Sequence, residues 1–507
     1  MQGGFICTVN APIAHTDTGK VRGFIQDGVN TFYGIRFAQA RRYHRAEPAT
    51  PWTGVKDAFN FGYVAPLMQR EMPRRGLLDV YRYWPESEDC LYANVWSPSL
   101  DCRARKPVMV WIHGGGYTHG SSIASAACEG DELCRHGDVV VISFNHRLNI
   151  LGCLDLSEYG KQYEHSGNLV MADIIEGLRW VRRNAAAFGG DPDNVTVFGH
   201  SSGGAKISNL IQMPEADGLF HKAIIMTGII PPQLRVDPET SRARTRAIME
   251  ELGIDKDHGR RIESVPLDKL IAAGVRAEAL LRSRGYKPNW GVHWGTDFRG
   301  DPLVTGLRTR AKDIPIMSGS SLGEHDAYSF PGVECFTQTS LNQALEQKYG
   351  PSARRLTQLF QGAYPNKPLA DLLAVNAHTR ICNLDFMDLC ARSGCENLYA
   401  YVFAFDFPYC GGLPAWHGAE LPFAFHTQGR VPICQAPGAG DLADQMTAAW
   451  TNFARRGDPN GPGVPFWPAY RQDRKATMVF DLASQARTDY DRALVEAIGE
   501  AAPFDFG

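Results

Sequence analysis

The stretch NVTVFGHSSGGAKISNLIQM, residues 194–213, decides the fold. Its first part, VTVF, has the β-branched and aromatic residues of a buried strand, and its last part, AKISNLIQM, has the apolar spacing of a helix. Between them lies the pattern G-x-S-x-G, with Ser201 at its centre and Gly199, Gly203 and Gly204 around it. A serine that joins a strand directly to a helix through small residues is exposed on a tight turn. The stretch therefore predicts Ser201 as a nucleophile.

The same five-residue pattern occurs a second time, at GSSLG, residues 319–323, after the strand-like IPIM. Leu322 and then GEHDAYSF follow Ser321, and these residues do not have the pattern of a helix. A nucleophile turn needs a helix that starts at once and directs its backbone N–H groups at the site. We therefore expect Ser201, and not Ser321, to be the nucleophile.

A second motif, HGGG at residues 113–116, follows the strand-like VMVWI. A glycine-rich loop at the end of a strand can present backbone N–H groups to the oxyanion that forms when a carbonyl is attacked. The alternative is that the three glycines only form a tight turn. Together with the serine turn, the loop favours an enzyme whose serine attacks a carbonyl carbon.

Strand-like and helix-like segments alternate along the chain, without repeats or a long linker. This alternation predicts one α/β domain over residues 1–507 with a mainly parallel sheet. The stretch 328–395 has helical patterns only, and we expect it to cap the carboxyl edge of the sheet. The predicted strands are 107–112, 139–144, 195–198, 222–226 and 398–405, and the predicted helices are 171–187, 242–252, 267–281, 356–363, 385–393 and 445–456.

Composition excludes several classes of partner. Lys and Arg total 52 and Asp and Glu total 55, a net charge of −3, so we expect no nucleic acid or anionic membrane surface as a partner. The longest apolar runs are far shorter than the roughly 20 residues of a membrane span. The twelve cysteines form no CxxC pair and no zinc-type grouping, which predicts no metal site. The N-terminus has no signal-peptide pattern, so we expect a cytoplasmic protein.

Several blocks of the sequence resemble the type-B carboxylesterase and cholinesterase family of α/β-hydrolases, and the resemblance covers nearly the whole chain. They include SEDCLYANVWSP (87–98), VMVWIHGGGYTHGSS (108–122), HGDVVVISFNHRLNILG (136–152), the segment 167–204 that ends in GHSSGG, and WHGAELPFAF (416–425). The resemblance implies an α/β-hydrolase fold, with a central, mostly parallel sheet flanked by helices and helical cap insertions around an active-site gorge.

The resemblance also implies a catalytic triad. Seven histidines follow Ser201, and HGAELPFAF matches the segment that holds the catalytic histidine, which selects His417. The segment PIMSGSSLGEHDAYSF resembles the one that ends in the catalytic acid, which selects Glu324. The oxyanion donors would be the backbone N–H groups of Gly115, Gly116 and Ser202. No metal or organic cofactor is implied, and the partner would be a small-molecule ester.

The sequence departs from the family at the nucleophile turn. His200 stands where the family usually has Glu, which removes a fixed negative charge and weakens the case for a cationic choline ester. His200 either contacts substrate or His417, or only fills space beside the turn. Tyr286, Trp290 and Trp294 precede the acid, where the family builds its acyl pocket, so they are candidate substrate walls; the alternative is aromatic core packing.

We therefore expect a serine carboxylesterase that works through an acyl-enzyme. Two other functions stay open. The same fold and triad could perform acyl transfer, lactonisation or elimination, or the chain could be an inactive binding module. The sequence leaves the acyl and alcohol specificity and the oligomeric state undetermined.

Overall fold

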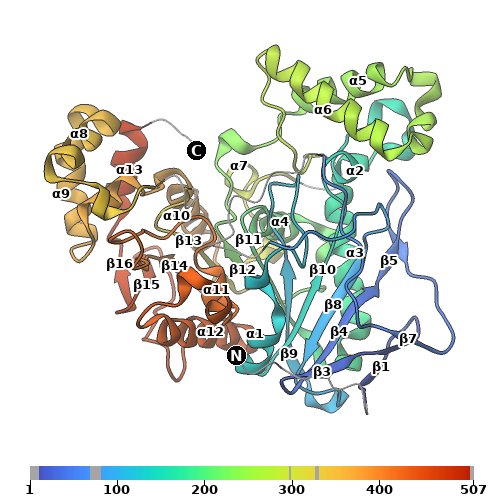
Figure 1. Ribbon diagram of the computed structural model, residues 1–507, viewed down its shortest axis with the longest axis horizontal. Helices are drawn as coiled ribbons and strands as arrows, with labels where there is room; N and C mark the ends of the chain where they lie inside the picture. Colours follow the sequence, from blue (N-terminus) through green and yellow to red (C-terminus); the bar gives the residue numbers. More distant parts are fainter. Residues whose placement is uncertain (1–10, 69–80, 296–298, 326–329, 503–507) are drawn as a thin grey trace.

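A large twisted sheet forms the centre of the protein. The computed structural model describes residues 11–68, 81–295, 299–325 and 330–502. Its main sheet has eleven strands, and Figure 1 shows it running through the molecule with helices on both faces. In spatial order the strands are β16 (Gln485–Thr488), β15 (Ala476–Phe480), β14 (Leu398–Phe403), β13 (Ile316–Ser321), β12 (Lys222–Met226), β11 (Gly190–His200), β9 (Lys106–Ile112), β10 (Val140–Phe144), β8 (Tyr92–Ser97), β4 (Val29–Arg36) and β3 (Phe24–Gln26).

The strands from β9 to β15 pair in parallel, and the strands at both edges pair antiparallel. All five predicted strands are present with similar bounds, and β11 begins earlier, at Gly190. Because the central strands are parallel, their carboxyl ends meet at one edge, where β9 and β11 end beside the HGGG loop and the serine turn. Shorter strands form two small sheets: β1 (Ile13–His15), β2 (Lys20–Arg22) and β7 (Val55–Asp57), and β5 (Ala38–Gln39) with β6 (Glu47–Pro48).

Alternate side chains of each central strand enter separate hydrophobic clusters. In β9, Val108, Val110 and Ile112 join the cluster that contains α3 to α6, whereas Met109 and Trp111 join the one that contains α1, α11 and α12. A strand buried on both faces needs such a continuous apolar run. The helices are α1 (Gly130–Gly137), α2 (Asn149–Gly152), α3 (Leu169–Asn184), α4 (Ser202–Gln212), α5 (Pro238–Glu251), α6 (Leu267–Ser283), α7 (Pro302–Thr305), α8 (Gln338–Tyr349), α9 (Ala353–Ala363), α10 (Ala377–Arg392), α11 (Leu421–Ala424), α12 (Ala439–Arg456) and α13 (Arg492–Ala501).

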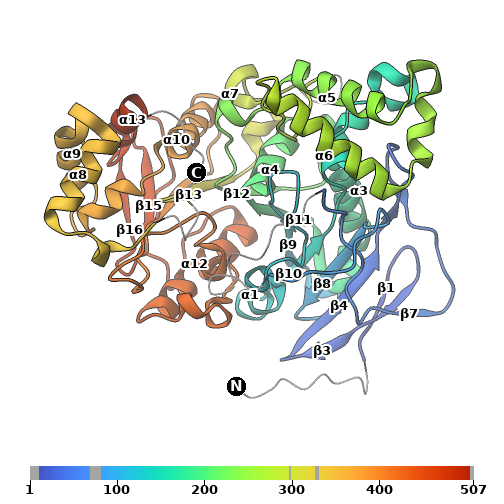
Figure 2. The ribbon, with the colours of Figure 1, turned by 45° about the horizontal axis from the view of Figure 1, so that its top comes forward.

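The predicted cap differs from the structure. Helices α8, α9 and α13 share a cluster with side chains of β14 and β15, and Figures 1 and 2 show these helices at the β16 end of the sheet. Of the described part of 328–395, Thr379 in the first turn of α10 lines the active-site cavity. Helix α6 and the residues after it supply another part of the wall, through Glu278, Arg282 and Trp290. The helices predicted within 328–395 are present, but the surface that α8 and α9 cover depends on their contacts with α13.

The charged pair of Arg147 and Asp173 is buried inside the fold. The guanidinium of Arg147 forms two hydrogen bonds to Asp173, of 2.6 and 2.8 Å, and the two side chains are 3% and 0% exposed. Buried charges persist in proteins when they are paired in this way. The pair connects the segment after β10 to α3. None of the described helices is long and apolar enough to cross a membrane.

Candidate active site

Ser201 lies on the turn between β11 and α4. Its backbone has φ 57° and ψ −130°, a conformation that is uncommon for a residue with a side chain. Its N–H donates to the carbonyl of Met226 (2.9 Å), which holds the turn against β12. A methyl group on Gly199 or Gly203 would lie 2.5 or 2.1 Å from the carbonyl oxygen of Ile112, so both positions require glycine. The sharp turn that the sequence predicts is present.

The glycine loop lies against this turn. A methyl group on Gly114 would be 2.6 Å from the carbonyl oxygen of His200 and 3.2 Å from Cβ of Ser201. Gly115 and Gly116 have φ of 105° and 60°, which favour glycine. Ser202 is the first residue of α4, and the N–H groups of a first helical turn have no acceptor within the helix. The three predicted oxyanion donors thus come from two segments that lie next to Ser201.

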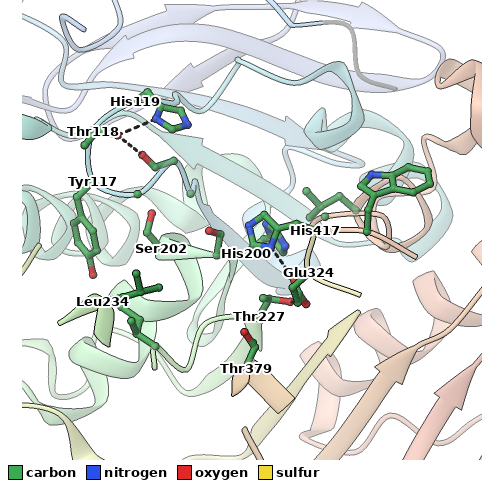
Figure 3. Close-up of a pocket in the computed structure, with 18 of the residues that line it drawn as sticks. Tyr117, Thr118, His119, His200, Ser202, Thr227, Leu234, Glu324, Thr379 and His417 are labelled. Atoms are coloured by element: carbon green, nitrogen blue, oxygen red, sulfur yellow. Dashed lines mark hydrogen bonds and ion pairs between the residues drawn. The ribbon is translucent and has the colours of Figure 1, made fainter. Parts of the chain in front are cut away.

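Glu324 and His417 are hydrogen-bonded to each other. The distance between Nδ1 of His417 and Oε2 of Glu324 is 2.5 Å. The other carboxylate oxygen, Oε1, accepts hydrogen bonds from Oγ1 of Thr227 (2.9 Å) and from the N–H of Ser321 (3.0 Å). The side chain of Glu324 is 1% exposed, so these bonds replace water around the carboxylate. Figure 3 shows the acid, the imidazole and Thr227 in this arrangement.

A second histidine and a second carboxylate lie behind this pair. The imidazole of His200 is 4.5 Å from that of His417, centre to centre, and its Nε2 is 3.9 Å from Oε1 of Glu420. Oε2 of Glu420 accepts a hydrogen bond from Oγ of Ser321 (3.0 Å). Burial, and then the charge of Glu324, raise the pKa of Glu420 to about 7. Figure 3 shows His200 beside His417 at the cavity.

The site opens into a cavity of about 550 Å³. The segment after β12 contributes Ile229, Ile230, Pro231 and Leu234, and the segment around His417 contributes Trp416, Leu421 and Pro422. Polar groups come from the glycine loop, from Glu324 and His417, and from Glu278 and Arg282 on the wall formed by α6. An apolar chamber with a few converging polar groups is typical of a small-molecule site.

The predicted wall residues occupy different places. His200 and Trp290 line the main cavity, and Trp290 donates from Nε1 to Glu278 (2.5 Å). Trp294 is 45% exposed and lines a smaller neighbouring cavity. Tyr286 is half-buried and lines neither of these two cavities. Contact of any of the four with substrate stays a prediction.

Sequence reasoning missed Thr227, Ser321 as a support, and Glu420. Thr227 follows β12 with φ 48°, and Glu420 lies three residues after His417 in the HGAE block, which is the one local signal that pointed to it. Two groups of side chains among the described residues have ligand-type atoms within 4.8 Å of one another: His200 with Glu324 and His417, and Glu132 with His136 and His426. Glu324 already accepts three hydrogen bonds, and Glu132 is paired with Arg135 and Arg430, so both groups have partners other than a metal ion.

Comparison with known proteins assigns the family. Residues 10–496 match the model of the carboxylesterase family. The para-nitrobenzyl esterase of Bacillus subtilis is 30% identical over 92% of this chain and 94% of its own, and the phenmedipham hydrolase of Pseudarthrobacter oxydans is 32% identical over 93% and 95%. A solved esterase from anaerobic Clostridium hathewayi, which can hydrolyse aliphatic aromatic polyesters, is 41% identical with a TM-score of 0.94, over 98% of this chain and all of that one.

The α/β-hydrolase fold expected from the sequence is thus confirmed by these matches as well as by the strand order. The likeness extends over nearly the full length of this chain and of these relatives, so it concerns the whole fold and not one motif. This chain belongs to the carboxylesterase family and is a carboxylic ester hydrolase.

Proposed function

We propose that Ser201 is the nucleophile, that His417 is the general base and acid, and that Glu324 orients His417. The hydrogen bond from Nδ1 of His417 to Glu324 supports this assignment most directly. An imidazole whose Nδ1–H is held by a carboxylate has its Nε2 available to accept a proton. Ser201, on its strained turn, lines the same cavity as both partners.

The reaction follows from these roles. Oγ of Ser201 attacks the ester carbonyl carbon while its proton passes to Nε2 of His417, and the oxyanion accepts hydrogen bonds from the N–H groups of Gly115, Gly116 and Ser202. Collapse breaks the bond to the alcohol, which takes the proton from His417. Water then attacks the acyl-enzyme by the same steps and releases the acid.

We infer that the substrate is an uncharged ester with apolar groups on both sides of the ester bond. The apolar side chains of Ile229, Ile230, Pro231 and Leu234, and those of Trp416, Leu421 and Pro422, support this, because they line the same cavity as the triad. His200 in place of the family's usual Glu supports an uncharged alcohol over a choline-type cation. The polyester-hydrolysing relative suggests aliphatic and aromatic esters as the first compounds to test.

We also propose that residues 1–507 form one domain and that the enzyme is cytoplasmic. One sheet includes strands from β3 to β16, and the site draws on positions from 114 to 417, which supports a single unit. Cys90 and Cys153 are thiols inside the main hydrophobic cluster, and burial raises the pKa of Cys153 to about 12. Buried protonated thiols suit a reducing compartment.

A fluorophosphonate probe tests the nucleophile. We expect wild type and Ser321→Ala to be labelled and Ser201→Ala to remain unlabelled. Ser321→Ala is the matched control, because both serines lie in a G-x-S-x-G pattern. Labelling of Ser201→Ala would remove the assignment.

A panel of alkyl and aryl esters of graded acyl length, with an alcohol such as ethanol added, tests the reaction. We expect free acid as the main product and higher kcat/KM for apolar than for cationic alcohols. Transfer of most of the acyl group to the added alcohol would instead support the acyl-transfer alternative.

A further inference from the structure

Lys206 is a buried lysine that the mechanism above does not use. It lies in α4, and its side chain is 0% exposed. Its Nζ donates to the carbonyl oxygen of His113 (2.9 Å) and lies 5.0 Å from the centre of the Tyr117 ring. His113 and Tyr117 are the residues directly before and after the three glycines of the loop. One ammonium group therefore contacts both ends of the loop that contains two predicted oxyanion donors.

The surroundings of Lys206 make a packing role costly. Among the described residues, Cys153 is the one ionisable group whose charge shifts the pKa of Lys206, and no carboxylate contributes. The titratable groups that face it are His113, Tyr117, Cys153 and His146, whose imidazole stacks on that of His113 at 4.3 Å. Burial, and then Lys206, lower the pKa of His113 to about 3, so that imidazole is neutral. Burial also lowers the pKa of Lys206 to about 7. An amino group buried without a counter-ion, neutral or charged, stabilises a core less than an apolar residue of similar size.

We propose that Lys206 is a positioning residue that fixes the oxyanion loop relative to helix α4. The third predicted donor, the N–H of Ser202, belongs to the first turn of that helix, one turn before Lys206. The hydrogen bond to His113 and the contact with Tyr117 thus join the segment that supplies two donors to the element that supplies the third. Displacement of donors by about 1 Å is enough to lower a rate by about 100-fold. The inference rests on the proposed role of Ser201 and the loop.

Replacement of Lys206 by Met tests the inference, because Met is unbranched and only one atom shorter, and it removes the amino group together with its hydrogen bond. We expect kcat for a p-nitrophenyl ester to fall about 10- to 100-fold with KM changed less than about threefold, since the loop acts on the transition state. The inhibition constant of a trifluoromethyl ketone, which forms an oxyanion on Ser201, should rise by a similar factor. Lys206→Arg, which keeps a cationic donor, should lose less activity than Met.

Lys222→Met is the matched control. Lys222 is another buried lysine, in β12, with its Nζ bound to Asn194 and its pKa lowered to about 8 by burial. It should lose stability but keep kcat within about threefold. If Lys206→Met does not fold, Lys206→Gln, one atom shorter and neutral, replaces it. A kcat within threefold of wild type in the folded variant would overturn the inference. A rise in KM as large as the fall in kcat would overturn it too. Retained fluorophosphonate labelling of the variant separates this failure from a failure of the proposed nucleophile.

Discussion

The two G-x-S-x-G segments lie on either side of the same strand and do different work. β11 and β13 both pair in parallel with β12, and each of them has a G-x-S-x-G pattern at its carboxyl end. Ser201 leaves the sheet at φ 57° and starts α4, whereas Ser321 is the last residue of β13 and is 2% exposed. The N–H of Ser321 holds Glu324 and its hydroxyl holds Glu420. Ser201 lines the cavity and Ser321 is not among its lining residues, so the residues after the pattern, and not the pattern itself, decide where the serine lies.

The largest effect expected from this difference concerns the two serines themselves. Ser201→Ala should lower kcat by about 10⁵-fold or more without loss of stability, because only the attacking oxygen is removed. Ser321→Ala should keep kcat within about tenfold but lose about 1–3 kcal/mol of unfolding free energy, because it leaves a buried carboxyl oxygen without its donor. Steady-state kinetics and urea unfolding of both variants measure the contrast. Similar losses of kcat in both would abolish the distinction.

The next largest effect concerns Glu324 and Glu420, the two carboxylates that accept hydrogen bonds from Ser321. Glu324→Gln should lower kcat by about 10³- to 10⁴-fold, because the amide cannot fix the required tautomer of His417 or stabilise its cation. Glu420→Gln should lower kcat by less than about tenfold, since Glu420 accepts a hydrogen bond from Ser321, whereas it is Glu324 that is bonded to Nδ1 of His417. Rates at saturating ester concentration compare them, with the thermal midpoint of each variant as the check on folding. A smaller loss in Glu324→Gln than in Glu420→Gln would mean that the acid is misassigned.

The first glycines of the two patterns differ in what surrounds them. A methyl group on Gly199 would meet backbone atoms of Ile112 and Gly203, at 2.5 and 2.8 Å, whereas one on Gly319 would meet the ring of Tyr401 at 2.3 Å. Gly199→Ala should therefore shift the oxyanion region and lower kcat about 10- to 100-fold. Gly319→Ala should cost about 1–3 kcal/mol of stability through overpacking and leave kcat within about threefold. Kinetics normalised to the folded fraction separate the two, and equal kcat values would contradict the expectation.

The smallest effect is a pH dependence of stability. The pKa of Glu420 is raised from an ordinary 4.5 to about 7 in the folded protein, so the folded state keeps a proton that the unfolded chain releases. The corresponding stability is complete below pH 4.5 and is lost as pH rises through 7, by about 3 kcal/mol at most. The thermal midpoint of wild type should thus fall relative to that of Glu420→Gln between pH 5 and pH 8. Parallel curves for the two proteins would argue against a buried, protonated Glu420.

Local patterns predict the main strands and the turn at Ser201, whereas Glu324 and His417 follow from the family resemblance. The strand β11 and the turn at Ser201 are encoded by adjacent residues, so the local pattern predicts both directly. The blocks around Glu324 and His417 could be matched through the family, and the structure brings the two side chains together. Thr227, Glu420 and Lys206 had no comparable signal, because each acts through a partner from a distant segment. The location of α8 and α9 was missed for the same reason, since it depends on α13.

The order of the site residues along the chain has a consequence for protein synthesis. The glycine loop and Ser201 come from the first half of the sequence, whereas His417 follows β14. A ribosome therefore completes the proposed nucleophile, Ser201, well before the proposed general base, and a serine without its base is a poor nucleophile. Catalytic turnover begins only when the last third of the polypeptide has been made and docked, so esterase activity reports the completion of folding in a translation reaction.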